Sequence, residues 1–196
     1  ILVNNAGRSI RRSLTLSYDR MHDYERTMQL NYFGPVQLML ALLPGMRERR
    51  FGTIVNLSSI GARICPEGSG YYAAAKAAVE AMTLSLRKEL APLGIHATVV
   101  EPGAFRTDFA GRSLTQAEHA IVDYAETAGR RRKELDRVHG TQPGDPARAA
   151  AALVDAVESG NPPYLLLLGN DAVDAVRTAL AALRDDIDTW EATSRS

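Results

Sequence analysis

A tyrosine and a lysine stand four residues apart in the run YYAAAK at residues 71–76. The alanines around them indicate a helix, and residues at this spacing share one helical face. A phenol has an ordinary pKa of ~10, and a nearby ammonium stabilises its ionised form. We therefore expect Lys76 to help Tyr72 exchange protons near neutral pH. A pair at this spacing also occurs on ordinary surface helices, so it does not define a site by itself.

A strand before this helix is predicted to bring hydroxyl groups to the same place. Residues 52–59, GTIVNLSS, are apolar and β-branched and end in Ser58 and Ser59, a pattern typical of a buried parallel strand. Open α/β sheets bind their ligands at the carboxyl ends of such strands. An earlier strand-like run, residues 1–3, leads into the turn NNAG at residues 4–7. The sequence thus predicts a ligand site where these segments end.

Taken together, these motifs resemble the short-chain dehydrogenase/reductase family. Its signatures are Asn-Asn-Ala-Gly, an asparagine within a helix, a serine at a strand end, Tyr-x-x-x-Lys, and Pro-Gly after the next strand. All occur here in that order, as residues 4–7, Asn31, Ser59, Tyr72 with Lys76, and Pro102 with Gly103. The resemblance extends from residue 1 to about residue 108 and is looser beyond. One departure is Ala75, where many members carry serine.

The resemblance implies four catalytic residues. Tyr72 would exchange a proton with a carbonyl or alcohol, and Lys76 would favour the phenolate and bond the cofactor ribose. Ser59 would hydrogen-bond the substrate oxygen. Asn31 would bend its helix and complete a proton relay through water. The expected substrate is a small carbonyl or alcohol compound, and the expected activity is that of an oxidoreductase.

The resemblance also implies NAD or NADP as the cofactor. Asn4 would tie neighbouring strands together, and Ala6 and Gly7 would lie near the adenosine half. The backbone of Phe105 would contact the nicotinamide carboxamide, and Thr107 would lie near the phosphates. The expected cofactor-binding set is Asn4, Ala6, Gly7, Tyr72, Lys76, Pro102, Gly103, Phe105 and Thr107.

The expected fold class is α/β, a partial Rossmann-type doubly wound parallel sheet that lacks its first strands. Four parallel strands are expected near Ile1, Ile54, Ile95 and Tyr164, with helices between them. We expect one domain over residues 1–196. Its catalytic core would be residues 1–108, its substrate lid about 105–140, and its C-terminal amphipathic helix about 170–194.

Composition limits the other possibilities. The 23 basic and 23 acidic residues balance, which disfavours nucleic acid or an anionic membrane as a partner. No apolar stretch has the length of a membrane span. The single Cys65 allows no internal disulfide, and no cysteine–histidine cluster has metal-ligand spacing, so we expect no metal and a cytoplasmic location.

The start of the chain leads to a further expectation. A glycine-rich phosphate turn after the first strand is absent, and the sequence opens with Ile1 inside a strand. We therefore expect the natural protein to be longer at its N-terminus, and we expect this chain alone neither to bind a dinucleotide tightly nor to turn over. By resemblance, the full-length form would be a homodimer or homotetramer. Two alternatives stay open: a catalytically silent binding protein, and an epimerase or dehydratase related to the extended family members.

Overall fold

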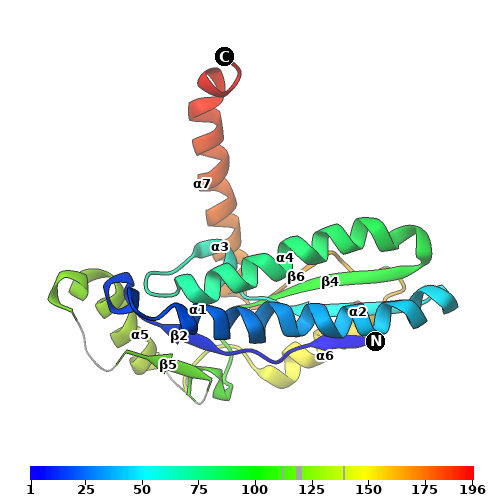
Figure 1. Cartoon of the computed structure of the whole chain (residues 1–196), viewed down its shortest axis with the longest axis horizontal. Coiled ribbons are helices and arrows are strands. Elements are labelled where there is room, and N and C mark those ends of the chain that lie inside the picture. Colours follow the sequence, from blue (N-terminus) through cyan, green and yellow to red (C-terminus); the bar gives the residue numbers. More distant parts are fainter. Residues whose placement is uncertain (112, 118–120, 139) are drawn as a thin grey trace.

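The computed structural model describes residues 1–111, 113–117, 121–138 and 140–196. Its main sheet has four parallel strands in the order β1-β3-β4-β6 (Figure 1). These are β1 (Leu2–Asn4), β3 (Gly52–Leu57), β4 (Ile95–Pro102) and β6 (Leu165–Leu168). The expected parallel α/β sheet is confirmed, with all four strands at the predicted places.

Helices connect the strands of the sheet. A long helical run between β1 and β3 consists of α1 (Met21–Met28), a π-helical segment (Gln29–Phe33) and α2 (Gly34–Arg49). The helix that carries Tyr72 is α4 (Gly70–Leu90), and the connection before β6 contains α6 (Pro146–Glu158). The N-cap of α6 is Asp145, whose carboxylate accepts from the backbone N–H groups of Ala147 and Arg148. This is the helix start expected from Gly-Asp-Pro.

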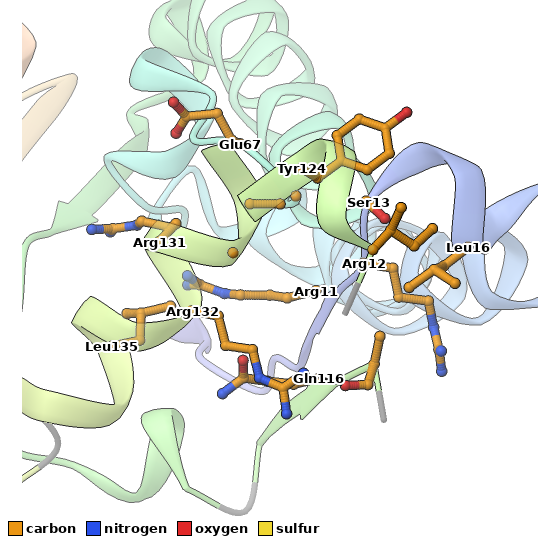
Figure 2. Close-up of a pocket in the computed structure, with 15 residues that line it drawn as sticks. Arg11, Arg12, Ser13, Leu16, Glu67, Gln116, Tyr124, Arg131, Arg132 and Leu135 are labelled. Atoms are coloured by element: carbon orange, nitrogen blue, oxygen red, sulfur yellow. Dashed lines mark hydrogen bonds between the residues drawn. The ribbon is translucent and has the colours of Figure 1, made fainter. Parts of the chain in front are cut away.

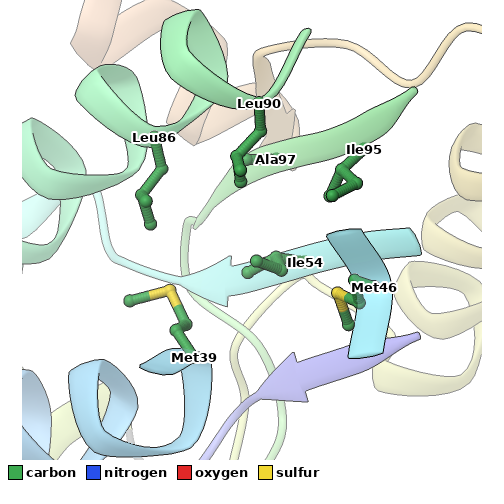
Figure 3. Close-up of a cluster of buried hydrophobic side chains, with 7 residues drawn as sticks. All are labelled: Met39, Met46, Ile54, Leu86, Leu90, Ile95 and Ala97. Carbon is green, nitrogen blue, oxygen red and sulfur yellow. The ribbon is translucent and has the colours of Figure 1, made fainter. Parts of the chain in front are cut away.

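The main hydrophobic core fills the space between α2, α4 and one face of the sheet (Figure 3). Ile54 is fully buried and Ile95 nearly so, because β3 and β4 lie inside the sheet. Met39 and Met46 reach them from α2, and α4 contributes Leu86 and Leu90. This packing fixes α4 over β3 and β4 and thereby sets the position of Tyr72.

The last helix, α7 (Asn170–Ser194), has the predicted bounds. Its first turns pack closely, with Ala172 and Val176 buried. Farther along, the same apolar stripe is exposed, and Figure 1 shows the helix extending away from the sheet toward the C-terminus. The exposed part of the stripe consists of Leu180, Leu183, Ile187 and Trp190.

Two short segments differ from the sequence-based expectation. The polar residues 8–22 predict a loop with one helical turn. The structure contains that turn as a 3₁₀ helix (Leu14–Ser17), but β2 (Ser9–Arg11) pairs in parallel with β5 (Leu114–Gln116). A strand of three residues is too short to show alternation, and its partner is far away in the sequence. Pro66, Gly68 and Gly70 predict a loop over residues 60–70, but this segment contains the short helix α3 (Gly61–Ile64).

The expected lid region is built from several short pieces. A 3₁₀ turn (Asp108–Ala110) follows β4, and β5 comes next. A second 3₁₀ turn (Val122–Tyr124), a π-helical turn (Ala125–Gly129) and α5 (Arg130–Val138) complete the region. His119 and His139, which we expect at the surface, lie outside the described residues.

Candidate active site

Tyr72 and Ser59 approach each other from different elements. Tyr72 lies in the first turn of α4 and is 6% exposed, and Ser59 follows the end of β3. The Ser59 hydroxyl accepts a hydrogen bond from the N–H of Gly61 at 3.1 Å. Ser59 is also a hydrogen-bond partner of the Tyr72 phenol. A Cβ at Gly61 would lie 3.3 Å from Ser59 Oγ and 3.7 Å from the Tyr72 ring. The two hydroxyl-bearing side chains therefore border one common space.

The pKa of Tyr72 differs from the sequence-based expectation. Burial raises it to about 12, and the opposing effects of the Ser59 hydrogen bond and the positive charge of Arg11 are smaller. The Lys76 ammonium lies 5.6 Å from the centroid of the Tyr72 ring. Contrary to the expectation from the sequence, it does not lower the pKa of the phenol. At neutral pH the phenol therefore keeps its proton and is suited to donate it.

Lys76 lies one turn after Tyr72 on the same face of α4, as the spacing predicts. Its side chain is buried, and its Nζ donates to the carbonyl oxygen of Leu57 at the end of β3, at 2.6 Å. Burial lowers the pKa of Lys76 to about 8, and the nearby Glu80 carboxylate partly opposes that shift. The ammonium is thus tied to the same strand end that carries Ser59.

Asn31 lies inside the π-helical segment, where the sequence indicated an irregular helix. Its Oδ1 accepts from the N–H of Arg8 at 3.2 Å, and its Nδ2 donates to the carbonyl oxygens of Arg8 and Thr27 at 3.0 and 2.9 Å. The side chain is 1% exposed. Asn31 therefore joins the helical run to the chain that leaves β1.

The turn after β1 lies against this group. A Cβ at Gly7 would be 3.1 Å from Asn31 Oδ1 and 3.4 Å from Lys76 Nζ, so the absence of a side chain allows this close approach. Ala6, its neighbour, is exposed. The structure thus brings Gly7, Asn31 and Lys76 together at the carboxyl edge of the sheet.

Asn4 holds the strands of this edge together, as expected. Its Nδ2 donates to Asn56 Oδ1 at 2.7 Å, between β1 and β3. Asn56 in turn donates to Thr83 Oγ1 at 2.8 Å, on α4. These three side chains are buried, and their hydrogen bonds fix β1, β3 and α4 relative to one another.

The remaining predicted cofactor residues follow β4. The Pro102 carbonyl accepts from Ile60 N–H at 3.4 Å, and Gly103 N–H donates to the carbonyl of Leu168 at 2.9 Å. Phe105 is half-buried and forms a parallel bridge with Gly144. The exposed Thr107 caps the following 3₁₀ turn, its hydroxyl accepting from Phe109 N–H. Pro102, the last residue of β4, thus contacts the segment that follows Ser59, whereas Gly103 and Phe105 contact β6 and Gly144.

Sequence reasoning missed a charged cluster behind the site. The guanidinium of Arg63 on α3 pairs with Glu80 on α4 at 3.1 Å and with Glu101 on β4 at 3.0 Å. Both carboxylates are buried, and the Ser58 hydroxyl donates to Glu80. Burial is the largest cause that raises the pKa of Glu80 to about 7. No spacing rule links these residues, because they come from three separate elements.

The sequence also did not indicate that Phe109, in the expected lid, contacts Tyr72. Its ring lies 5.6 Å from the ring of Tyr72, measured between centroids, at an angle of 50°. This contact places the start of the lid region over the predicted reacting phenol. The sequence showed only an apolar residue in a poorly patterned segment.

Two features are absent from the part of the chain that the structure describes. None of its helices combines the length and apolarity needed to cross a membrane. No group of three or more histidine, cysteine, aspartate or glutamate side chains within the described ranges is placed to hold a metal ion.

A comparison with family models matches residues 1–118 to "short chain dehydrogenase". An uncharacterized oxidoreductase of Mycobacterium tuberculosis is 55% identical over 107 residues, which are 55% of this chain and 31% of that protein. The match thus spans less than a third of that relative's length.

Two solved structures resemble the whole chain. A short-chain dehydrogenase from Streptomyces avermitilis superposes with a TM-score of 0.89 and 41% identity, covering 99% of this chain and 69% of that one. A short chain dehydrogenase from Burkholderia cenocepacia in complex with NADP has a TM-score of 0.68 and 26% identity, covering 96% and 68%.

Proposed function

Because this chain belongs to the short-chain dehydrogenase family, we propose that it carries the catalytic residues of a nicotinamide-dependent oxidoreductase that interconverts a ketone or aldehyde and an alcohol. One observation supports this most: Tyr72, Ser59 and Lys76 gather at the carboxyl edge of the sheet. That edge is where open parallel sheets bind ligands.

The residues at this edge fit one part of a nicotinamide dinucleotide. The Lys76 ammonium has three N–H donors, and its hydrogen bond within the described residues goes to Leu57 O. Its other donors suit ribose hydroxyls, and the small residues Ala6 and Gly7 leave room beside them. Pro102, Gly103, Phe105 and Thr107 would line the neighbouring strand end. When bound, the nicotinamide would supply or accept the hydride.

In this proposal Tyr72 donates the proton during reduction. A phenol with a pKa raised to about 12 is protonated at neutral pH, so it can pass its proton to the carbonyl oxygen as that oxygen gains charge. The Ser59 hydroxyl donates a hydrogen bond to the same oxygen, a contact worth roughly 3 kcal/mol when well aligned. Asn31 fixes the backbone at Arg8 and Gly7, which borders Lys76.

The same proposal assigns parts of the chain to functions. Residues 1–108 form the catalytic core, and residues about 105–140 fold over the substrate, since Phe109 contacts Tyr72. Substrate choice then depends on this segment together with residues 60–70. The core and the lid belong to one domain with the C-terminal helix.

Deuterium transfer tests the proposal directly. The natural protein that contains this chain would be incubated with carbonyl substrates and with NADH or NADPH deuterated at the transferred position. A reductase gives an alcohol with deuterium on the former carbonyl carbon and an equal amount of oxidised cofactor. Cofactor binding without turnover would indicate the silent binding protein, and product formation without net cofactor oxidation would indicate the epimerase or dehydratase.

A further inference from the structure

A small pocket lies between β2 and the segment that contains β5 and α5 (Figure 2). Its volume is about 50 Å³, whereas one water needs roughly 10–15 Å³ by the same measure. The pocket therefore has room for one small chemical group and not for a whole substrate. Its lining includes Arg11, Arg12, Ser13, Tyr124, Arg131 and Arg132.

Arg11 extends through the middle of the side chains drawn in Figure 2. Its Nε and Nη1 atoms are buried and have no hydrogen-bond partner. Among the described residues, no carboxylate forms an ion pair with it. A buried charge without a partner costs free energy, so such groups are normally paired. Burial and the nearby Arg131 lower the pKa of Arg11, but a guanidinium remains charged at neutral pH.

The neighbouring charges do not compensate for Arg11. The carboxylate of Asp23 pairs with Arg12 at 3.4 Å, and Glu134 pairs with Arg131 at 3.3 Å. Arg132 donates to the backbone carbonyl of Ala117 at 2.6 Å. The carboxylate of Asp136 accepts from Gln116, and Glu67 is exposed. Glu67 also lines the pocket, so the charged lining residues are four arginines and one glutamate. Within the part of the chain that the structure describes, the pocket therefore has an excess of positive charge.

Two further donors in the pocket are also unsatisfied. Arg131 Nε and the Ser13 hydroxyl are buried without a hydrogen-bond partner. Together with Arg11 they offer N–H and O–H donors and an uncompensated positive charge. Guanidinium groups bind carboxylate and phosphate oxygens in paired hydrogen bonds, so an anion suits all of these groups at once.

The pocket is built on elements that contact the helix and the segment around the reacting phenol. The positive charge of Arg11 is the smallest of the causes that shift the pKa of Tyr72, and it opposes the rise. The strand that carries Arg11, β2, packs against α4, and β5 continues from the segment that places Phe109 on Tyr72. A molecule bound at Tyr72 can therefore place another of its groups near Arg11.

We propose that this pocket binds an anionic group of the substrate, a carboxylate, phosphate or sulfate on the molecule whose carbonyl or alcohol group faces Tyr72. This inference rests on the proposed function and assigns Arg11 as the residue that selects anionic substrates. The small carbonyl or alcohol compound expected from the sequence would then carry a charged group.

Thermal unfolding tests the pocket without any need for turnover. Melting temperatures of the natural protein containing this chain would be measured with sodium acetate, phosphate or sulfate, at matched ionic strength. We expect at least one anion to raise the wild-type Tm by at least about 2 °C, and Arg11→Met to lose that rise while melting higher than wild type without the anion. Arg130→Met is the matched control, since Arg130 is exposed on α5 and does not line the pocket.

Kinetics with matched substrates test the selectivity. The compounds are 4-acetylbenzoate, 4-acetylphenyl phosphate and the neutral methyl 4-acetylbenzoate, so the arms also distinguish carboxylate from phosphate. We expect kcat/KM to favour an anionic compound over the ester at least ~10-fold, and this ratio to fall at least ~10-fold in Arg11→Met but not in Arg130→Met.

The outcomes distinguish a failure of the pocket assignment from a failure of the proposed reaction. An unchanged ratio in Arg11→Met, or equal anion stabilisation of wild type and Arg11→Met, would overturn the pocket assignment. If none of the three compounds is reduced but the anion effect on Tm depends on Arg11, the pocket assignment stands and the proposed reaction is in question.

Discussion

The side chain of Asn31 binds both backbone groups of Arg8: its Oδ1 accepts the N–H at 3.2 Å, and its Nδ2 donates to the carbonyl at 3.0 Å. An amide is the side chain suited to this task, because it carries a donor and an acceptor side by side. The chain that leaves β1 and the π-helical segment are thereby held as one unit.

Substitution of Asn31 tests the orientation of its amide, in which Nδ2 donates and Oδ1 accepts. Asn31→Asp would set a carboxylate oxygen against the carbonyls of Arg8 and Thr27, where an N–H now donates. At pH 7 we expect it to lower the free energy of unfolding more than Asn31→Ala does, by about 1–3 kcal/mol. The gap should narrow at lower pH as the carboxylate gains a proton. Urea unfolding of both variants measures it, and equal losses at pH 7 would contradict the assigned orientation.

Tyr72→Phe removes the proposed proton donor while keeping the ring against Phe109. We expect turnover to fall at least ~100-fold with cofactor affinity nearly unchanged. Steady-state kinetics and cofactor titration provide both values. The matched control is Tyr71→Phe, because the neighbouring ring stacks on Tyr24 instead, at 3.7 Å. Normal turnover of the Tyr72 variant would remove this residue from the mechanism.

Gly7→Ala places a methyl group between two proposed site residues. The new Cβ would lie 3.1 Å from Asn31 Oδ1, so Asn31 must shift by a few tenths of an ångström, and it would lie in van der Waals contact with Lys76 Nζ at 3.4 Å. We expect kcat/KM to fall about 10-fold, because small displacements of positioning groups reduce catalysis strongly. Gly70→Ala is the control, since a Cβ there meets nothing within 4 Å. If both variants retain wild-type kinetics, the contact at Gly7 has no role in positioning Lys76.

Glu80→Gln tests the buried carboxylate behind the site. Since the pKa of Glu80 is raised to about 7 in the folded protein, the unfolded chain releases this proton at lower pH than the folded protein does. Protonation of Glu80 therefore stabilises the folded protein. This contribution to the free energy of unfolding is complete below the ordinary glutamate pKa of ~4.3 and is lost as pH rises through about 7. We expect the stability of wild type relative to Glu80→Gln to decline over this window and then level off.

Urea unfolding at several pH values from 5 to 8 measures that decline. Lys76, with a pKa of about 8, titrates at the upper end of this range and Tyr72, with a pKa of about 12, above it, so the decline due to Glu80 is read between pH 5 and 7. Glu89→Gln on the exposed side of α4 is the control and should show no such dependence. A wild-type advantage that stays constant across the range would argue against a raised pKa at Glu80.

The sequence predicted elements whose pattern repeats over many residues. β3, β4 and α7 show such patterns, whereas β1 and β6 are short and were predicted from apolar runs next to turn residues. The spacing of Tyr72 and Lys76 correctly predicts a shared face, since the Lys76 ammonium lies 5.6 Å from the centroid of the Tyr72 ring. The effect of Lys76 on the phenol was not predictable, because it depends on burial and on a hydrogen bond to Leu57. The spacing of two residues along a helix indicates neither how deeply they are buried nor which hydrogen bonds they form.

Contacts between short, distant segments also had no sequence signal. Arg11 lies in a three-residue strand whose partner, β5, is about half the chain away. The ion pairs of Arg63 join three elements that meet only after the sheet has formed. The proposed anion pocket and the carboxylate cluster are thus products of tertiary structure.

The π-helical segment has a consequence for the tolerated length of the chain. A π-helical turn holds more residues than an α-helical turn, and each residue advances an α-helix by about 100°. Because the π-helical turn accommodates about one extra residue, removing one residue from Gln29–Phe33 and restoring regular α-helix would leave α2 in nearly its present rotation relative to α1. A single-residue deletion in the first turns of α2, which is regular α-helix, would instead rotate Met39 and Met46 by about 100° away from the sheet and should therefore be far more harmful.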